Sequence, residues 1–577
     1  MSSTLRTSVC AVLLVALGNI GGAGEPKRVE AIDTDGKSFQ GTLTAGDGGH
    51  LQLEVAGMPL SLDHFARLRF PAPDAPLLLR PLLHRVIIRD RQTLIGELLG
   101  IDKEQLQLRT AWSEKLSIPR GAVDRITHLP GWRPVVVEEF EQPPAGWELS
   151  GAEIAEGEAT SGRHSLTMAK GGQWARFRAA KPLSDGRAAI HFLVPRQLPA
   201  DSWSAEWSFG RGDSAQTVRI ELAGTGKDYR CSAPGAADYR GDVPRRAGWH
   251  RLEVEFTRER LLVLIDDYVL WSGPRKAALG ALIECRLACE APADKVATGV
   301  RFDDFVMSRP FPEPKRIEPG DPTQDVVVSF DGDETFGAIL DLAPLRIGQE
   351  GRGAKQAHDW RSVREVIFRR GALVEQETNG DHVRLRLRAR GGQREEIEGA
   401  VVALEGDCLK LIHSFLGELT IPIARIDELR PVFRGRRIPI ESSPRHLGRG
   451  MKSGFAVSKG EGDLLRWQFK FNVPMSSALV IEAARVLGEE DGLDVKAALR
   501  RGGLQTEVSI NGRRVDDLNR HVDRSGWQSV WVRIPVPSEL LSAGTNIVEL
   551  RQTADRETGR SGACEVRSIR LEIPERR

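Results

Sequence analysis

One stretch of the sequence occurs twice, and this repeat constrains the fold more than any other feature. Residues Gly96–Ile126 (GELLGIDKEQLQLRTAWSEKLSIPRGAVDRI) and Gly399–Leu429 (GAVVALEGDCLKLIHSFLGELTIPIARIDEL) align without a gap. The shared positions are mainly apolar strand residues, with a Gly and a Pro: Gly96/Gly399, Leu106/Leu409, Leu108/Leu411, Leu116/Leu419, Ile118/Ile421, Pro119/Pro422 and Asp124/Asp427. Core positions and turns therefore define the repeat, which predicts a shared scaffold and not a duplicated active site.

Each copy forms part of a larger block with an internal repeat. Before Gly96 the chain runs through Val29–Phe70 with the same plan of short alternating strands and polar turns, and Asp325–Leu340 repeats that first segment. Period-two alternation buries one face of each strand, so a curled five-stranded sheet is the expected unit. The units resemble Sm-like small β-barrels, and we expect one pair at residues 25–132 and a second pair at 320–435.

A different block separates the two pairs. In Gly248–Gly273 (GWHRLEVEFTRERLLVLIDDYVLWSG), Leu252, Val254 and Phe256 alternate along one strand, and a second strand follows a polar turn. Together with the closing VRFDDFVM strand, which we expect to pair with the chain near Glu139-Phe140, this pattern resembles the laminin-G or concanavalin-A-like jelly roll. The resemblance implies two curved antiparallel sheets over residues 133–312, with a concave face that often binds glycans in relatives.

The last block, 436–577, resembles the galactose-binding-like β-sandwich. Its strands surround an Asn511-Gly512 turn, the segment VWVRIPVPSELLSAGTN and a closing EVRSIRLEI strand. The whole chain is therefore predicted to be all-β and multidomain, with two pairs of small β-barrels alternating with two β-sandwich domains. This order suggests two barrel–sandwich arms. Helical periodicity is scarce, and the one short candidate, Ser477–Leu487, also fits a strand.

The N-terminus indicates export. Arg6 precedes the apolar run Ser8–Ile20 and the small residues Gly21–Gly24, which is typical of a signal peptide over residues 1–24. We therefore expect an exported bacterial protein that is secreted, periplasmic or on the cell surface, with no membrane span after cleavage. The 81 basic and 80 acidic residues nearly balance and form no basic cluster, which argues against nucleic acid as a partner. The five cysteines outside this segment are interpreted as small buried hydrophobes.

The sequence contains no catalytic constellation. Glycoside hydrolysis requires two carboxylates across the scissile bond. The nearest pattern is EVEFTRE, where Glu253 and Glu255 alternate with core residues and are expected to face solvent. The pairs Asp266-Asp267 and Asp303-Asp304 are candidate ligands for Ca²⁺, with strand-end aspartates as the alternative interpretation. No other cofactor is indicated.

Tryptophans are the candidate sugar-binding residues, because an indole ring offers a flat apolar surface with a polar edge. Trp203 and Trp207 lie four residues apart on one strand face, although core packing is the alternative. Trp527 and Trp531 belong to GWQSVWVRIPV, where alternation turns Trp531 and Arg533 outward.

These features favour an exported, non-catalytic protein that binds carbohydrate or another cell-envelope or matrix component, or that acts as a scaffold. One alternative is a carbohydrate-active hydrolase related to the keto-disaccharide hydrolases, which use a similar jelly roll. That alternative requires convergent carboxylates or a metal site on the concave face of the jelly roll. The other alternative is a purely structural component of a surface assembly.

Overall fold

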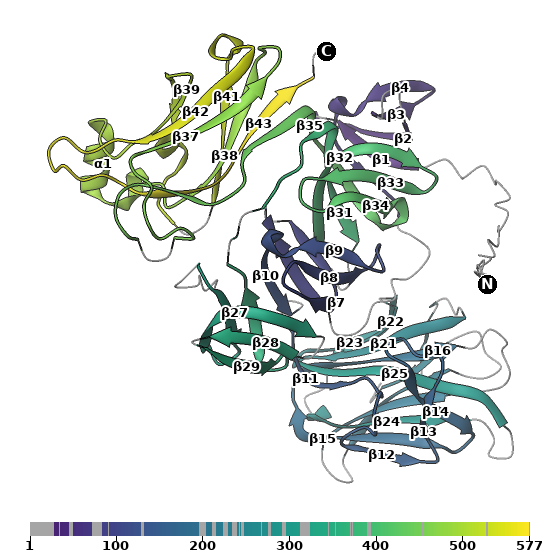
Figure 1. Cartoon of the computed structure of the whole chain (residues 1–577). Coiled ribbons are helices and arrows are strands. Elements are labelled where there is room, and N and C mark those ends of the chain that lie inside the picture. The colour runs from purple at the N-terminus through teal and green to yellow at the C-terminus, as the bar shows by residue number, and fades with distance from the viewer. Residues whose placement is uncertain are drawn as a thin grey trace, which may run out of the picture.

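The structure is a computed structural model of the chain (Figure 1). It describes residues 28–575 apart from 34, 46–49, 72–82, 90–91, 129–131, 195–202, 211–214, 223–228, 234–238, 242, 244–246, 267, 275–278, 291–295, 312–322, 344–345, 352, 370, 372, 389–393, 453–454 and 527–528. The predicted signal segment 1–24 lies outside the described residues.

The predicted all-β, multidomain fold is confirmed. Strands dominate the described part of the chain, and its one α-helix is α1 (Leu493–Arg500). The segment that also offered helical periodicity forms β38 (Ser477–Ala484), a central strand whose residues are all buried. Burial on both faces removes the alternation that distinguishes a strand from a helix. Four of the five cysteines are buried, as predicted: Cys231, Cys285, Cys289 and Cys564. Cys408 is half-buried.

Four five-stranded units share one strand order, in which the first strand pairs with both the second and the fifth. A short 3₁₀ turn separates the fourth strand from the fifth in units 1, 2 and 4. Unit 1 contains β1 (Arg28–Asp33), β2 (Ser38–Ala45), β3 (Leu51–Val55), β4 (Met58–Ser61) and β5 (Phe65–Arg69). Unit 2 contains β6 (His84–Ile88), β7 (Thr93–Ile101), β8 (Gln105–Thr110), β9 (Leu116–Pro119) and β10 (Val123–His128). Unit 3 contains β26 (Asp325–Ser329), β27 (Glu334–Ala343), β28 (Arg346–Gly351), β29 (Ala354–Asp359) and β30 (Val363–Ile367). Unit 4 contains β31 (Thr378–Arg388), β32 (Arg394–Glu405), β33 (Cys408–His413), β34 (Gly417–Pro422) and β35 (Ile426–Glu441).

The units do not form two separate arms, and this part of the sequence interpretation is wrong. The fifth strand of unit 1 pairs with that of unit 4, and the fifth strand of unit 2 pairs with that of unit 3. Buried side chains from all four units form a single hydrophobic cluster. Pairing across the copies covers strand edges that two isolated barrel pairs would leave open to solvent.

The contacts between the copies are reciprocal. The backbone N–H of Phe70 donates to the carbonyl of Asp427 at 3.0 Å, and that of Phe368 donates to the carbonyl of Asp124, also at 3.0 Å. Asp124 and Asp427 are equivalent in the repeat, as are the two phenylalanines that close units 1 and 3. A contact in which each half supplies the same two groups is the signature of an isologous, two-fold interface. The four units therefore form an internal pseudo-dimer.

A second reciprocal contact lies where β7 meets β32, at the pair Thr93 and Glu396. The side-chain carbonyl of Gln92 accepts a hydrogen bond from the N–H of Glu398 at 2.7 Å. The carboxyl oxygen of Glu395 accepts one from the N–H of Ile95, also at 2.7 Å. Gln92, directly before β7, and Glu395, on β32, are equivalent in the repeat, so the pseudo-two-fold relation extends to this contact.

The middle block folds as a jelly-roll-like sandwich of two antiparallel sheets around its own core. One sheet contains β11 (Trp132–Glu138), β13 (Glu153–Glu156), β14 (His164–Lys170), β16 (Gly186–Val194), β21 (Gly248–Phe256), β22 (Arg260–Ile265), β23 (Tyr268–Pro274) and β25 (Val296–Pro310). The other contains β12 (Trp147–Ser150), β15 (Trp174–Leu183), β17 (Trp203–Phe209), β18 (Gln216–Leu222), β19 (Tyr229–Ser232), β20 (Tyr239–Gly241) and β24 (Leu282–Cys289). The opening strand β11 pairs with the closing strand β25, with Glu138 opposite Phe305.

The last block is a second sandwich with its own core. One sheet contains β37 (Leu464–Phe471), β39 (Thr506–Ile510), β40 (Arg513–Asp517) and β42 (Gly544–Gln552). The other contains β36 (Arg445–Leu447), β38, β41 (Val530–Val536) and β43 (Cys564–Pro574). Strand β35 leaves unit 4 and pairs with β43 from Gly435 onward, so the sheet of unit 4 continues directly into the sandwich (Figure 1).

Candidate functional site

The outer face of β41 carries the aromatic and cationic side chains that alternation predicted. Val532, Ile534 and Val536 are each 1 % exposed and pack into the core of the sandwich. Trp531 is half-buried and Arg533 is exposed on the opposite face. Trp527 lies outside the described residues.

Three arginines surround this part of the face. The guanidinium of Arg570, on β43, lies over the Trp531 ring at 5.0 Å from its centroid, which is a cation–π distance. Arg533 and Arg437 both form ion pairs with the buried carboxylate of Glu572. Partial burial, and then the charges of Arg437 and Arg570, lower the pKa of Arg533.

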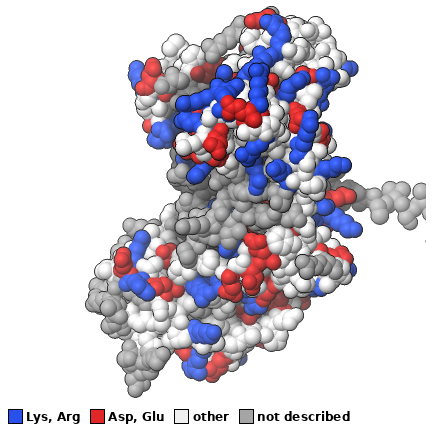
Figure 2. Space-filling view, turned by 90° about the vertical axis from the view of Figure 1, so that its left-hand side faces the viewer, with Lys and Arg blue, Asp and Glu red and all other residues white. Residues whose placement is uncertain are grey.

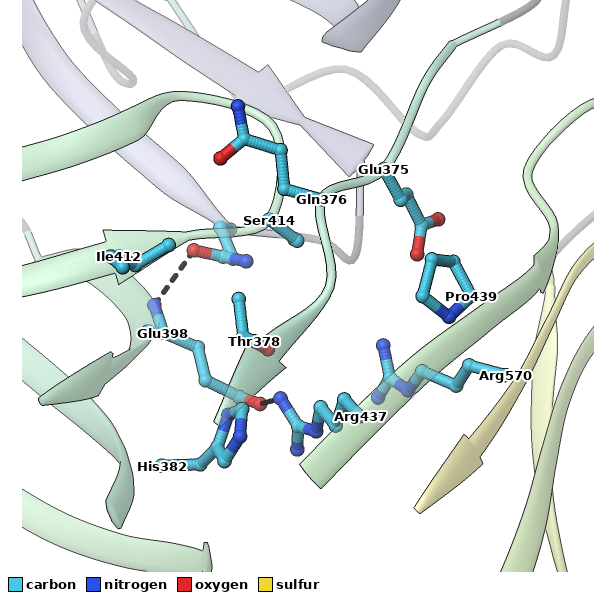
Figure 3. A pocket seen from close by; sticks show the side chains of 12 residues that line it. Glu375, Gln376, Thr378, His382, Glu398, Ile412, Ser414, Arg437, Pro439 and Arg570 are labelled. Atoms are coloured by element: carbon cyan, nitrogen blue, oxygen red, sulfur yellow. Dashed lines mark hydrogen bonds and ion pairs between the residues drawn. The ribbon is translucent and has the colours of Figure 1, made fainter. Parts of the chain in front are cut away.

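A narrow pocket opens beside this arginine cluster, between unit 4 and the C-terminal sandwich (Figure 3). Its volume of about 20 Å³ accommodates a group the size of one water molecule. Nearly all of its lining can form hydrogen bonds: Gln92, Glu375, Gln376, Thr378, His382, Glu398, Ser414, Arg437 and Arg570, with Gly399, Ile412 and Pro439 completing it. The pocket therefore contains both hydrogen-bond donors and acceptors, and it shares Arg570 with the Trp531 face.

Glu398 and His382 are both deprotonated in this pocket, which leaves the first charged and the second neutral. Burial alone would raise the pKa of Glu398, but the charges of Arg437, Arg570 and Arg384 outweigh it and lower the pKa to about 2. Arg437 donates to the Glu398 carboxylate at 2.6 Å. Burial lowers the pKa of His382 to about 3, helped by the charge of Arg437, so the imidazole is neutral. The pocket therefore offers a fixed carboxylate, a neutral imidazole and two guanidinium groups.

The structure corrects the prediction for Trp203 and Trp207. They do share one face of β17, but that face is the core: Trp203 is 2 % exposed and Trp207 is fully buried. The Trp203 ring packs on Phe192, with centroids 4.6 Å apart. Neither ring can stack on a sugar, because the opposite sheet of the jelly roll, which contains β16, covers this face. The alternative interpretation, core packing, is correct for both.

The outer face of β16, β21 and β25 in the jelly roll is unexpectedly rich in buried ionisable groups. His191 on β16 stands between Arg251 on β21 and Asp303 on β25 in the strand register. Glu253 was expected to face solvent but is only 6 % exposed, and its carboxylate lies 3.6 Å from Arg251 and 3.9 Å from Arg187. A buried carboxylate requires such partners, since an isolated charge could not be desolvated at this position.

Asp303 and Asp304 hold the loop between β13 and β14. The Thr160 hydroxyl oxygen lies 2.8 Å from the carboxyl group of Asp303 and 2.6 Å from that of Asp304, and the Ser161 hydroxyl donates to Asp304 at 2.7 Å. His191 Nδ1 lies 3.2 Å from Asp304. Burial, and then the charge of Asp304, raise the pKa of Asp303 to about 7. Both aspartates thus meet protein donors at this position.

Asp266 lies in a separate cluster. Its carboxylate accepts a hydrogen bond from the N–H of Arg251 at 2.8 Å and lies 2.5 Å from His250 Nδ1. Asp267 lies outside the described residues. Within the described part of the chain, no three His, Cys, Asp or Glu side chains are arranged to hold a metal ion. Calcium binding by these aspartates stays a prediction.

Sequence reasoning missed most of the lining of the pocket. His382, Glu398 and Arg570 lie on three different strands, and Gln92 directly precedes a fourth. The four residues come from three different blocks, and no local motif connects them. One signal was present: Trp531 and Arg533 alternate outward, and the Arg570 and Glu572 pair alternates in the same way on the closing strand.

The chain has no match among protein-family models or among curated proteins. It is similar to solved structures over about a third of its length. The laminarinase from Rhodothermus marinus has 14 % sequence identity and a TM-score of 0.26, with 32 % of this chain and 99 % of that chain covered. The CBM2 module of the evolved Dit of Lactobacillus casei BL23 phage J-1 has 9 % identity and a TM-score of 0.25, with 32 % and 99 % covered. A glycoside hydrolase family 16 endo-glucanase from Bacteroides ovatus has 11 % identity and a TM-score of 0.24, with 31 % and 100 % covered. At these scores the similarities carry no argument about function.

The fold and the two polar faces define an all-β, multidomain chain in which two sandwiches flank a pseudo-dimer of small β units. On the face in Figure 2, Lys and Arg side chains gather mainly on the upper part of the molecule, interspersed with Asp and Glu. Among the helices of the described residues, none has the length and apolar character needed to cross a membrane.

Proposed function

We propose that this chain is an exported, non-catalytic glycan-binding protein whose principal site is the Trp531 face of the C-terminal sandwich. The observation that carries the proposal is the outward-facing Trp531, with Arg570 over its ring and the polar pocket beside it. An indole of this kind stacks on the apolar face of a pyranose, and charged and amide side chains next to it bind the hydroxyl groups. The pocket admits one small substituent, such as a hydroxyl group, while the sugar ring stays on the Trp531 face.

The test is binding of the full chain to a glycan array, followed by calorimetry on any glycan it retains. Trp531→Ala is expected to reduce affinity at least tenfold, which corresponds to about 1.4 kcal/mol. The matched control is Tyr268→Ala, which removes an aromatic ring that is 36 % exposed in the jelly roll, and it should leave affinity unchanged. If no glycan binds and pull-downs recover surface proteins, the chain is a structural component of an assembly.

A second function, glycoside hydrolysis in the jelly roll, is favoured by one specific observation. Two carboxylates, Glu253 and Asp303, share one sheet face with His191 and Arg251. The hydrolase alternative requires convergent carboxylates. The pKa of Asp303, near 7, is of the kind that suits a general acid. Release of reducing sugar by the full chain, lost in Glu253→Gln, would support hydrolysis. Glycan binding without release of reducing sugar would contradict hydrolysis and support binding as the function.

A further inference from the structure

A second, larger pocket lies between units 2 and 4, away from the Trp531 face. One wall is the end of β8 and the turn after it, with Thr110, Ala111, Trp112, Ser113 and Glu114. The other wall is the end of β34 and the 3₁₀ turn after it, with Pro422, Ala424 and Arg425. Its volume of about 320 Å³ falls in the range of small-molecule sites. Trp112, Ala111, Pro422 and Ala424 give it an apolar wall, so a ligand that fills it has an apolar face.

Arg425 is the unbalanced charge of this pocket. Within the described residues its guanidinium forms no ion pair or hydrogen bond, and its Nη1 atom is buried without an acceptor. Burial lowers the pKa of Arg425, and the neighbouring charge of Arg388 lowers it further. The one carboxylate in the lining, Glu114, is 93 % exposed and lies 3.4 Å from Arg109. A half-buried cation without a counter-charge is costly, and an anion entering the pocket would reduce that cost.

The pseudo-two-fold relation supplies an internal comparison. The positions equivalent to Trp112, Glu114 and Arg425 are Phe415, Gly417 and Ala122. Ala122 is fully buried in the shared core. The scaffold therefore folds with neutral residues at all three positions, and a Trp, a Glu and an Arg are not needed to build it. Only one of the two related places carries a tryptophan and an arginine.

We propose that this pocket binds an acidic sugar residue, a pyranose that carries a carboxylate, with the carboxylate paired to Arg425 and one ring face against the Trp112 wall. A guanidinium and a carboxylate form charge-assisted, often bidentate hydrogen bonds. The pocket is too large for a small inorganic anion to fill, and its apolar wall suits the C–H face of a sugar ring. The site is independent of the Trp531 face and does not rest on the function proposed for it.

The experiment is calorimetric titration of the full chain with digalacturonate, with the neutral digalactose disaccharide and sodium sulfate as comparison probes. Digalacturonate is expected to bind, digalactose to bind at least tenfold more weakly, and sulfate to compete poorly. Arg425→Ala, which installs the residue of the equivalent position, and Arg425→Gln should each reduce digalacturonate affinity at least tenfold. Trp112→Phe, which installs the equivalent Phe, should weaken binding less. Arg258→Ala, at a guanidinium that is 91 % exposed in the jelly roll, is the matched control.

Each outcome decides the proposal. Unchanged affinity in both Arg425 variants overturns it, as does equal binding of the neutral disaccharide. Competition by sulfate at the same strength overturns the assignment to a sugar ring. Retained digalacturonate binding in Trp531→Ala separates this pocket from the Trp531 face. Loss in Trp531→Ala with no effect of Arg425→Ala assigns the binding to that face and overturns the proposal.

Discussion

Arg125 of unit 2 and Glu365 of unit 3 form an ion pair at 2.6 Å, and the equivalent pair between units 1 and 4 carries the same charges in exchanged positions. In the repeat, Arg125 is equivalent to Glu428, and Glu365 is equivalent to Arg67. The equivalent ion pair is therefore Arg67 with Glu428, at 3.8 Å. Units 1 and 2 both supply Arg, whereas units 3 and 4 both supply Glu. Pairing within one copy would bring like charges together, so the charges favour pairing across the copies.

Reversing one of these charges should therefore destabilise the pseudo-dimer. In Arg125→Glu, two carboxylates would meet at a site where Glu365 is 2 % exposed, and we expect a loss of about 3 kcal/mol or more. The double variant Arg125→Glu/Glu365→Arg restores opposite charges and should recover most of the loss. Thermal unfolding of the full chain measures both. A double variant no more stable than the single one would contradict a role of charge in pairing.

The sequence predicted the units but not their partners, for a physical reason. Strand alternation and the repeated Leu, Ile and Gly positions are local, and they define each five-stranded unit. The partner of a fifth strand depends on side chains such as Arg67 and Glu428, which are separated by most of the chain and read as ordinary surface charges. The same limit applies to the pocket residues His382 and Arg570.

Alternation also predicts orientation better than burial. It placed Trp531 outward because the inward neighbours are aliphatic, and it placed Trp203 and Trp207 on one face. It could not show that this face is covered by a second sheet, since a buried and a binding tryptophan have the same sequence pattern. The prediction for Glu253 was wrong in a different way. Alternation correctly turned its side chain away from the core, but that outer face of the sheet is itself buried.

Glu395 should make stability fall as pH rises. Burial raises the pKa of Glu395 from 4.5 to about 8, so the folded chain keeps a proton that the unfolded chain releases. Stability is fully retained below pH 4.5 and is lost progressively towards pH 8. Glu395→Gln installs the residue of the equivalent position, Gln92, and keeps an oxygen for the N–H of Ile95. The variant should be more stable than the native chain at pH 8, by up to a few kcal/mol, and similar to it at pH 4.5.

Thermal unfolding of the full chain at several pH values measures this difference. Glu398→Gln is the matched control, because the pKa of Glu398 is lowered and its charge is paired with Arg437, so that substitution should destabilise the chain at neutral pH. A pH-independent effect of Glu395→Gln would contradict the prediction.

His84 should have the reverse pH dependence. The ring of His84 is buried against His128, with centroids 5.3 Å apart, and neither of its ring nitrogens has a hydrogen-bond partner within the described residues. Burial lowers the pKa of both, that of His128 from 6.5 to about 4. Between pH 6.5 and about 4 these histidines bind protons in the unfolded chain but not in the folded chain. The free energy of unfolding therefore falls as pH drops through this range.

His84 lies opposite Gly96 in unit 2, and Val383 lies opposite Gly399 at the equivalent place in unit 4. The substitution His84→Val therefore installs the residue that unit 4 has at this place. It should raise the unfolding temperature more at pH 5 than at pH 8. Equal shifts at the two pH values would show that packing, and not the imidazole charge, governs this site.

Gly96 and Gly399 are shared by the two copies because strands approach closely at both, and the approach is closer at Gly96. A Cβ at Gly96 would lie 2.1 Å from the carbonyl oxygen of Arg109, whereas one at Gly399 would lie 3.0 Å from that of Ile412. Gly96→Ala forces the backbone of β8 to move. We expect the variant to lose about 1–3 kcal/mol of stability or more, 1–3 kcal/mol being the usual loss for an overpacked core. Gly399→Ala needs a smaller adjustment and should cost less. Denaturant unfolding of the two variants side by side compares them, and equal losses would show that the glycines are shared for a reason other than the distance between strands.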